Sequence, residues 1–348
     1  MTIVPVSSER QGREFSVPWW RRPLERLVLS QYLVLLLTLI YFLAMLPIVP
    51  SIATPEVLLD IVNAMAPLLV VAIGQTFVLI VAGIDLSAPS VLAMASVVGA
   101  SIMTGDSGYL MDSPLAVPVS ILVFLVVGVL IGWFNGTCTA RLGMPSFIVT
   151  LTTMMFFSGA AIWYTALNTD ASSIGNLPPS FLWIGEGQFA GGFTLPILIA
   201  AAVALVAHFV LNNTVYGRWL YAIGTNMRAS EISGVPVRRA VIGAFMISGL
   251  CAGISSVLYT ARLETGTPVL GQRILLDVIG AAVIGGVSLF GGKGKIIWTV
   301  FGVLFLAVID KSLQLLGLTL FSVFAIKGGV ILLAATIDAL RHRLLASR

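Results

Sequence analysis

The chain has 348 residues, of which 58% are hydrophobic and only 10% are charged. A soluble domain carries roughly 25% charged residues to cover its surface. The composition therefore excludes a water-soluble globular protein and predicts an all-α polytopic membrane protein. The formal net charge of +4 comes from basic residues scattered over loop ends. They form no basic stripe, so nucleic acid is not an expected partner.

Apolar runs that are long enough to cross a bilayer, which takes about 20 helical residues, follow one another along the chain. The arginines and glutamates of residues 1–26 do not fit the start of a cleavable signal peptide, so the first run is expected to be a retained anchor. Hydropathy predicts ten transmembrane helices, at 27–48, 57–82, 88–104, 115–137, 146–167, 194–211, 240–262, 274–291, 296–316 and 321–340.

Basic residues are distributed unequally between the two sides of this arrangement. Fifteen Lys and Arg fall on the side of the N-terminal segment, whereas only Arg262 and Arg273 fall on the other side. By the positive-inside rule, both termini are expected to be cytoplasmic. The expected division is a cytoplasmic segment 1–26, a transmembrane domain 27–340 and a cytoplasmic tail 341–348.

Two polar segments are longer than simple turns. The external stretch 168–193 is rich in Gly, Ser and Pro and predicts an ordered cap. In the cytoplasmic stretch 212–239, Asn226 is expected to cap a two-turn helix that Gly234 ends in the left-handed conformation. A helix this short needs support from a partner surface, although one that simply lies on the membrane is the alternative.

No catalytic or metal-binding pattern is present. Cys138 and Cys251 lie inside apolar runs and are expected to be packing residues, and the two histidines fit no catalytic or ligand spacing. The glycine-rich stretch 285–295 has Val287 and Gly294 where a phosphate-binding loop needs Gly and Ser or Thr. We therefore expect no cofactor and no metal, and any ATPase that drives transport should be a separate chain.

Small and polar residues inside the spans indicate how the helices pack. Because lipid supplies no hydrophobic drive between helices, glycines four residues apart predict close helix contacts. Polar side chains at depth are expected to face the bundle or an aqueous path. Asn63, Gln75 and Asn135 are candidates for a translocation path, with hydrogen bonding between helices as the alternative. The glycines are Gly128, Gly132 and Gly136, together with Gly249 and Gly253.

Three charged positions carry specific expectations. Asp85, with Ser87, precedes the third span and is expected to cap it, with direct contact to a transported substrate as the alternative. Asp310 and Lys327 lie equally far from the turn between the last two spans, at about 12 Å from it. Two unpaired charges at that depth would be costly, so the pair is expected to form a structural ion pair, with Lys311 as a competing partner.

Four motifs follow one another along the chain. They are GQTFVLIVAGIDLS from Gly74, Asn135-Gly136 with PSFIVTL from Pro145, GRWLYAIGTN from Gly217 with Ile232-Ser-Gly-Val235, and IGGVSLFGGKG from Ile284. In this order they resemble the membrane subunit of bacterial ABC sugar importers of the ribose, xylose and autoinducer-2 type, over roughly residues 57 to 338. The chain departs from the usual pattern at Ala88-Pro89, at Ser158 and at Leu275, so its substrate is expected to differ from the simple pentoses.

The resemblance implies a bacterial inner-membrane permease with the large, type II-like fold of ten helices. Its implied partners are a second permease chain (identical or homologous), two cytoplasmic ATP-binding cassette subunits and a periplasmic sugar-binding protein. Arg262 and Arg273 are expected to dock the binding protein, unless they snorkel and pair with Glu264 or Asp277. The segment implied to couple to the ATPase contains Asn226, Arg228, Ser230, Glu231 and Gly234.

Three functions are compatible with these features. The favoured one is the membrane subunit of an ATP-driven importer of a monosaccharide or related polyol. A permease for nucleosides or branched-chain amino acids would share the bundle and differ in the residues of its path. A self-contained secondary transporter or membrane enzyme is disfavoured, because no convincing carboxylate or histidine relay lies at midplane.

Overall fold

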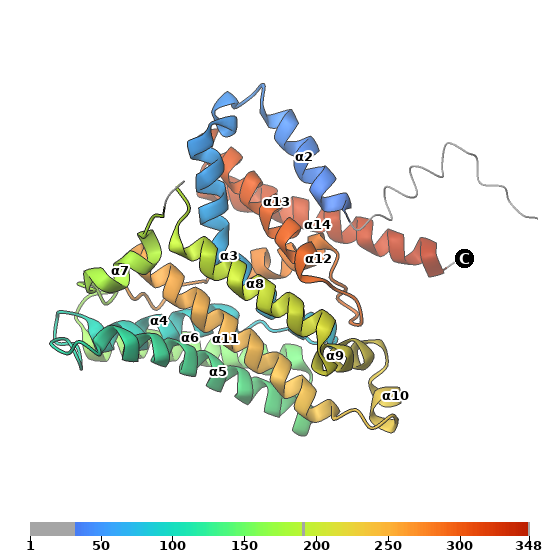
Figure 1. The fold of residues 1–348 in the computed structure, drawn as a ribbon, viewed down its shortest axis with the longest axis horizontal. Helices are drawn as coiled ribbons and strands as arrows, with labels where there is room; N and C mark the ends of the chain where they lie inside the picture. Colours follow the sequence, from blue (N-terminus) through green and yellow to red (C-terminus); the bar gives the residue numbers. More distant parts are fainter. Residues whose placement is uncertain (1–31, 190–191, 347–348) are drawn as a thin grey trace, which may run out of the picture.

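The computed structural model describes residues 32–189 and 192–346 (Figure 1). The predicted segment 1–26, the start of the first span, residues 190–191 of the cap and the last two residues of the tail lie outside these ranges. The described chain is helical, with no strand and two isolated β-bridges. Its helices are α2 (Leu33–Met45), η1 (Pro50–Ala53), α3 (Pro55–Ile80), α4 (Ala88–Met103), α5 (Ala116–Arg141), α6 (Ser146–Asn168), α7 (Pro179–Glu186), α8 (Leu195–Asn213), α9 (Val215–Thr225), α10 (Met227–Ile232), α11 (Val237–Leu263), α12 (Leu275–Gly285), α13 (Ile296–Leu315) and α14 (Leu320–Ala346).

The helical architecture of a polytopic membrane protein, predicted from the sequence, is confirmed. Within the described ranges, six helices are long and apolar enough to cross a bilayer, and four shorter apolar helices accompany them. The long ones are α3, α5, α6, α8, α11 and α13. The short ones are the apolar helices Leu33–Met45, Ala88–Met103, Leu275–Gly285 and Leu320–Leu333.

Each of the ten predicted spans contains a helix, but two predicted ends are wrong. Helix α14 continues to Ala346, beyond the predicted end at residue 340. Helix α12 ends at Gly285, whereas the span was expected to continue to residue 291. The reason is local, because Gly286 adopts a φ of +110° and turns the chain out of the helix. Gly291 and Gly292 also have positive φ, so the chain forms a folded loop before α13.

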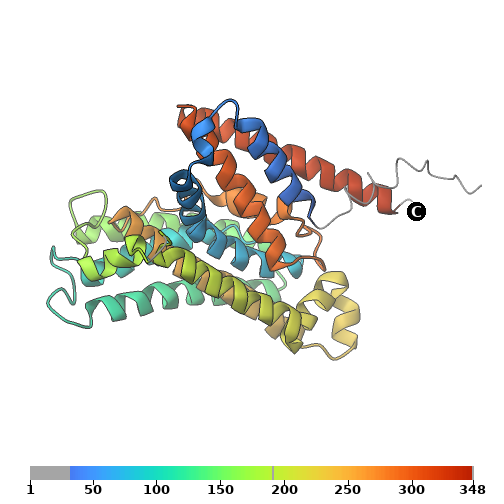
Figure 2. The ribbon, with the colours of Figure 1, turned by 45° about the horizontal axis from the view of Figure 1, so that its top comes forward.

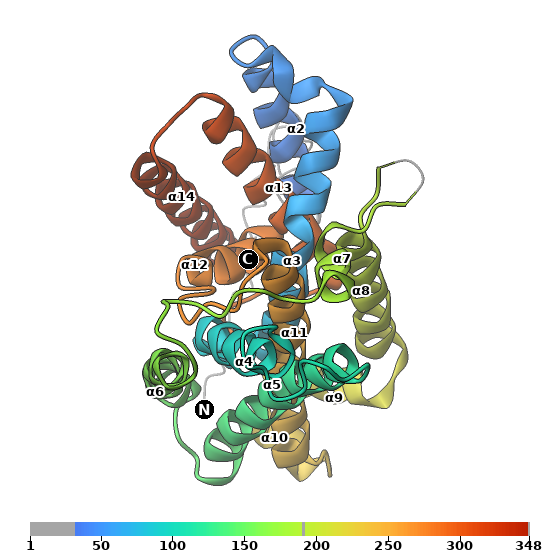
Figure 3. The ribbon, with the colours of Figure 1, turned by 90° about the vertical axis from the view of Figure 1, so that its left-hand side faces the viewer.

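The helices form two groups that α3 joins. Helices α4, α5, α6 and α11 pack together in one group, and α2, α12, α13 and α14 form the other (Figures 1 and 3). Helix α3 contacts α11 in the first group and both α12 and α13 in the second. Helix α10 and both ends of the described chain lie toward the same end of the bundle (Figures 1 and 2).

Helices α5 and α11 approach each other through glycine. A Cβ atom added at Gly128 would overlap the Gly249 carbonyl oxygen, and one at Gly132 would overlap the Phe245 carbonyl oxygen. A Cβ atom at Gly253 would lie 2.7 Å from the Phe124 carbonyl oxygen. The close contact predicted from the glycine spacing is therefore confirmed, and it is backbone against backbone.

We expect Gly132→Ala to lower the stability of the bundle by about 1–3 kcal/mol, because the new methyl group forces α5 away from α11. The matched control is Gly159→Ala, since Gly159 lies in helix α6 and a Cβ atom there has no neighbour within 4 Å. Alanine alone favours a helix by roughly 0.5–1 kcal/mol over glycine, so the control should hold or gain stability. Thermal unfolding in detergent measures both, and equal shifts in the two variants would contradict the packing argument.

Candidate functional site

The chain leaves helical geometry between α3 and α4, inside the bundle. Ala82 has a φ of +59°, and residues 83–87 form neither helix nor strand. Backbone groups that are buried away from water must find partners within the protein. The start of α6 supplies two of them, since the Ile84 N–H donates to Ser146 Oγ at 3.1 Å and Thr150 Oγ1 donates to the Ile84 carbonyl at 3.1 Å.

Asp85 lies at the centre of this segment and is 2% exposed. Its Oδ1 accepts the Ser87 N–H at 2.9 Å and the Ser87 hydroxyl at 2.6 Å, and its Oδ2 accepts the Ser248 hydroxyl of α11 at 2.8 Å. Ser87 is the residue that precedes α4, and its side chain accepts no N–H from the helix. The expected cap is therefore wrong in detail: the carboxylate fixes Ser87 and ties the segment to α11.

Asn135 of α5 continues this network and is fully buried. Its Nδ2 donates to Ser87 Oγ at 2.8 Å, and its Oδ1 accepts the Thr153 hydroxyl of α6 at 2.8 Å. The network thus runs from Ser248 through Asp85, Ser87 and Asn135 to Thr153, and it joins α11, α5 and α6 around the broken segment. Both ends of the Asn135 amide are satisfied within the protein.

Gln75 of α3 differs from Asn135. It is 1% exposed, and neither Nε2 nor Oε1 has a hydrogen-bond partner among the described residues. The neighbouring Gly74 packs against α11, where a Cβ atom on it would lie 2.9 Å from the Ser248 Cα. Gln75 is therefore the neighbour of a residue that packs against Ser248, and Ser248 donates to Asp85. An unpaired buried amide is costly, which points to a polar partner outside the described chain.

Asn63 lies nearer the start of α3, where its side chain contacts the residues that precede α8. Its Oδ1 accepts the Thr194 hydroxyl at 2.9 Å and the Thr194 N–H at 3.3 Å, and its Nδ2 donates to the Gly192 carbonyl at 3.4 Å. The structure therefore separates Asn63 from the network at Asp85, and it gives Asn63 a contact that holds the end of the 168–193 segment against α3.

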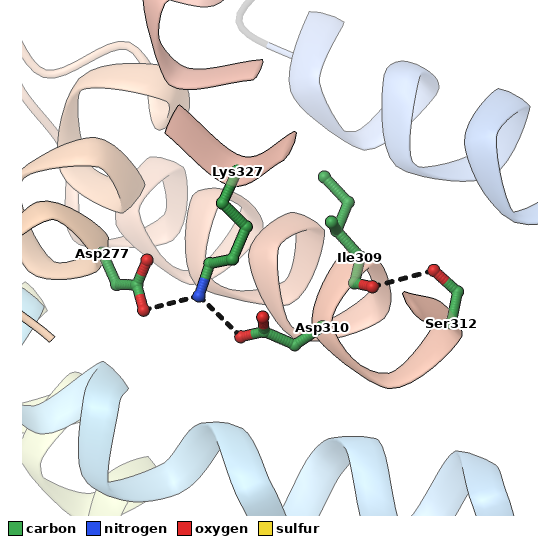
Figure 4. A network of polar contacts seen from close by, with 5 residues as sticks. All are labelled: Asp277, Ile309, Asp310, Ser312 and Lys327. Atoms are coloured by element: carbon green, nitrogen blue, oxygen red, sulfur yellow. Dashed lines mark hydrogen bonds and ion pairs between the residues drawn. The ribbon is translucent and has the colours of Figure 1, made fainter. Parts of the chain in front are cut away.

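Lys327 of α14 contacts two carboxylates (Figure 4). Its Nζ lies 2.9 Å from Asp310 Oδ2 of α13, the partner expected from the sequence, and 2.6 Å from Asp277 Oδ2 of α12. The Lys327 side chain is 5% exposed. Lys311 does not compete for this site, because its Nζ pairs with Asp60 at 3.0 Å. Three helices are therefore joined by one ammonium group.

The segment between α8 and α11 is a compact turn of two helices. Asn226 Oδ1 accepts the Ala229 N–H at 2.9 Å, which is the cap that the sequence predicts, and Gly234 has a φ of +82°. The Arg228 and Glu231 side chains pair at 3.0 Å and are 82% and 54% exposed. Ser230, in contrast, is buried and donates to the Asn226 carbonyl.

At the opposite end of the bundle, the segment after α11 pairs with the predicted cap. The backbones of Ile174 and Gly266 exchange two hydrogen bonds of 2.8 Å. Arg262 and Arg273 are both exposed. The Arg273 guanidinium lies 5.9 Å from the centroid of the Phe324 ring, a geometry that permits a cation–π contact. The alternative prediction paired the arginines with Glu264 or Asp277, but Asp277 is bound to Lys327.

Among the described residues, no group of three or more His, Cys, Asp or Glu is arranged to hold a metal. Cys251 is buried, and Cys138 is half-buried on α5.

Comparisons with known proteins give a family. The family model described as the permease component of a branched-chain amino acid transport system matches residues 57–335. The ribose import permease of Escherichia coli strain K12 is 33% identical over 97% of this chain and 99% of its own length. The ribose import permease of Bacillus subtilis is 35% identical over 83% and 86%. The galactose/methyl galactoside import permease of Haemophilus influenzae is 32% identical over 87% and 94%. No solved structure matches the chain.

Removing the ammonium group from Lys327 should destabilise the protein by about 3–5 kcal/mol, because Lys327→Gln leaves two carboxylates unpaired in a buried site. Adding Asp277→Asn and Asp310→Asn removes the stranded charges and should restore part of this loss, although each change alone is unfavourable. Thermal unfolding in detergent compares the Lys327→Gln variant, the Asp277→Asn and Asp310→Asn variants, and their combination. If the losses simply add, the three side chains do not act as one unit.

Proposed function

Because the chain belongs to the family of branched-chain amino acid transport permease components, we propose that it is the transmembrane subunit of an ATP-driven sugar importer in a bacterial inner membrane. A sugar is assigned as the substrate because the chain is similar, over nearly its full length, to permeases named for ribose and galactose import. The substrate class is a monosaccharide or related polyol. ATP hydrolysis is assigned to a separate ATP-binding cassette chain.

The substrate assignment is tested by a ligand screen on the partner binding protein, followed by uptake into proteoliposomes that contain the reconstituted complex. A labelled monosaccharide is expected to be taken up only with ATP inside and binding protein outside. The second candidate is a branched-chain amino acid, because the matching family carries that description. Uptake of labelled leucine with no uptake of sugar would replace the first assignment with the second.

We propose ten membrane crossings with both termini in the cytoplasm. Two contacts support this topology. The Ile174–Gly266 pairing joins two segments that charge counting places outside, and a hydrogen bond of 2.7 Å from the Tyr221 hydroxyl to the Gly294 carbonyl joins two segments that it places inside. A single arrangement of the spans therefore agrees with both the basic residues and the contacts.

The proposed contact with the ATPase is α10 and its flanks, Asn226 to Gly234. Met227 and Ile232 are 51% and 78% exposed, beside the Arg228–Glu231 pair. An apolar side chain beside exposed charges is suited to a protein partner. Ser230 faces inward, so its proposed role is to hold the shape of the turn.

For this contact, we expect Arg228→Ala and Glu231→Ala to lower sugar uptake and coupled ATPase activity while membrane insertion stays intact. Exchanging the pair, as Arg228→Glu with Glu231→Arg, keeps the internal ion pair but reverses both charges toward the partner, and it should not restore coupling. A cross-linker at Ile232→Cys should capture the ATPase. Full rescue by the exchange, or no capture from this position, would contradict the assignment.

For the path, we propose alternating access that brings Gln75 into contact with the sugar. Its amide has one donor group and one acceptor without partners, which match the hydroxyl groups of a polyol. Asn135 has no free hydrogen-bonding end in this conformation, so its proposed role is to hold the walls of the path through the network at Asp85. Asn63 is proposed to hold the segment at the external mouth.

The proposed remaining partners are a second permease chain, identical or homologous, and a periplasmic sugar-binding protein. The binding protein is proposed to dock at Arg262 and Arg273, the exposed basic residues of the external side. Docking charges steer encounter and fix register more than they add affinity.

Reversing both arginines, as Arg262→Glu with Arg273→Glu, should weaken stimulation of ATPase activity by the binding protein. The loss should be larger at low salt, where surface charges are least screened. ATPase activity without binding protein should not change and is the internal control. Stimulation that is unaffected at every salt concentration would remove the docking assignment.

A further inference from the structure

The glycine-rich loop between α12 and α13 meets the ends of α3 and α9. The Gly292 N–H donates to the Ile80 carbonyl at 2.8 Å, and the Tyr221 hydroxyl donates to the Gly294 carbonyl at 2.7 Å. The loop is closed on itself by a hydrogen bond of 3.0 Å from the Ser288 N–H to the Lys293 carbonyl. We call the junction of residues 80–82, 221–225 and 291–294 the three-way clamp.

The three-way clamp is built from backbone. A Cβ atom on Gly224 would overlap both the Ile80 carbonyl oxygen and the Gly292 nitrogen. A Cβ atom on Gly291 would lie 2.9 Å from both the Ala82 nitrogen and the Gly224 carbonyl oxygen, and one on Gly292 would lie 3.1 Å from the Thr225 nitrogen. Because most of these atoms are main-chain atoms, a displacement of one segment cannot be absorbed by side-chain rotation, and it is passed on to the others.

The three-way clamp lies between the proposed ATPase contact and the interior of the bundle. Helix α10 packs against α9 and α11, and α9 ends at Thr225, within the clamp. On the far side of the clamp, Ala82 begins the broken segment that leads to Asp85, and the glycine-rich loop leads back into α12 and on into α13. Burial raises the pKa of Tyr221, so its hydroxyl stays protonated and keeps its donor role at neutral pH.

We propose that the three-way clamp is the route by which movement of α10 reaches the path, with the loop at Gly291–Gly294 as a positioning element for transport. Through it, displacement of α9 moves the end of α3 and the loop that joins the end of α12 to the start of α13. The inference rests on the proposed contact of α10 with the ATPase. It adds a second element, far from α10 in the sequence, to the machinery of coupling.

The first test uses Tyr221→Phe, which removes one hydrogen bond and keeps the ring. Sugar taken up per ATP hydrolysed is expected to fall about two- to tenfold, the range that corresponds to a single hydrogen bond. Tyr109→Phe is the matched control, since the Tyr109 hydroxyl donates to Asn168 at 3.2 Å at the other end of the bundle. The inference is overturned if Tyr221→Phe transports as much sugar per ATP as the control.

The readout that separates this inference from the proposed function is capture of the ATPase from Ile232→Cys, made in the same background. Capture should be unchanged by Tyr221→Phe, because the change lies outside the contact. No capture from the parent chain means that the ATPase contact itself is wrong. Normal capture with lowered transport per ATP supports the clamp, whereas lost capture in Tyr221→Phe shows that Tyr221 acts on the contact and overturns the inference.

A second test joins two parts of the clamp with a disulfide between Thr225→Cys and Gly292→Cys. Transport is compared in one preparation before and after reduction, so any strain from the substitutions is the same in both states. Equal transport is expected if the two segments move together. Transport that appears only after reduction shows that the two segments must separate, and it overturns the inference.

Discussion

A peptide group that is buried away from water must find a hydrogen-bond partner within the protein, and the arrangement around residues 81–87 follows from this constraint. The segment is not helical, so its backbone takes partners from α6, and its buried carboxylate takes partners from Ser87 and from α11. These helices must keep their places for the segment to be tolerated. The break in the chain and the three helices that bind it, α5, α6 and α11, therefore form one structural unit.

The helices themselves were predictable because their signal is local. A run of about 20 apolar residues is sufficient to identify a membrane helix, and an asparagine cap or a left-handed glycine is visible within a few positions. The ion pair of Asp310 and Lys327 was also within reach, since two helices joined by a short turn keep equal depth. Asp277 was missed as a partner because its helix is not the neighbour of α14 in the sequence, and no spacing fixes how α12 is rotated.

The candidate site shows the limit of such reasoning more clearly. A buried amide in a membrane helix has the same sequence signature whether or not it is paired. Asn63 finds its partner 131 residues away, and Asn135 finds Ser87 48 residues away. Neither partner is visible from the local pattern. Of the three amides expected to face a path, only Gln75 has no partner among the described residues. This difference depends on how segments that are distant in the sequence pack together.

Helix α4 has a consequence for how the protein meets its bilayer. It has 16 residues and is about 24 Å long, shorter than a hydrocarbon core of about 30 Å, yet most of its residues are buried among α5, α6 and α11. A helix that does not touch lipid is not subject to hydrophobic mismatch. Sensitivity to bilayer thickness should therefore be confined to helices with exposed apolar surfaces, such as α6 and α8, while the centre of the bundle keeps its dimensions from one membrane to another.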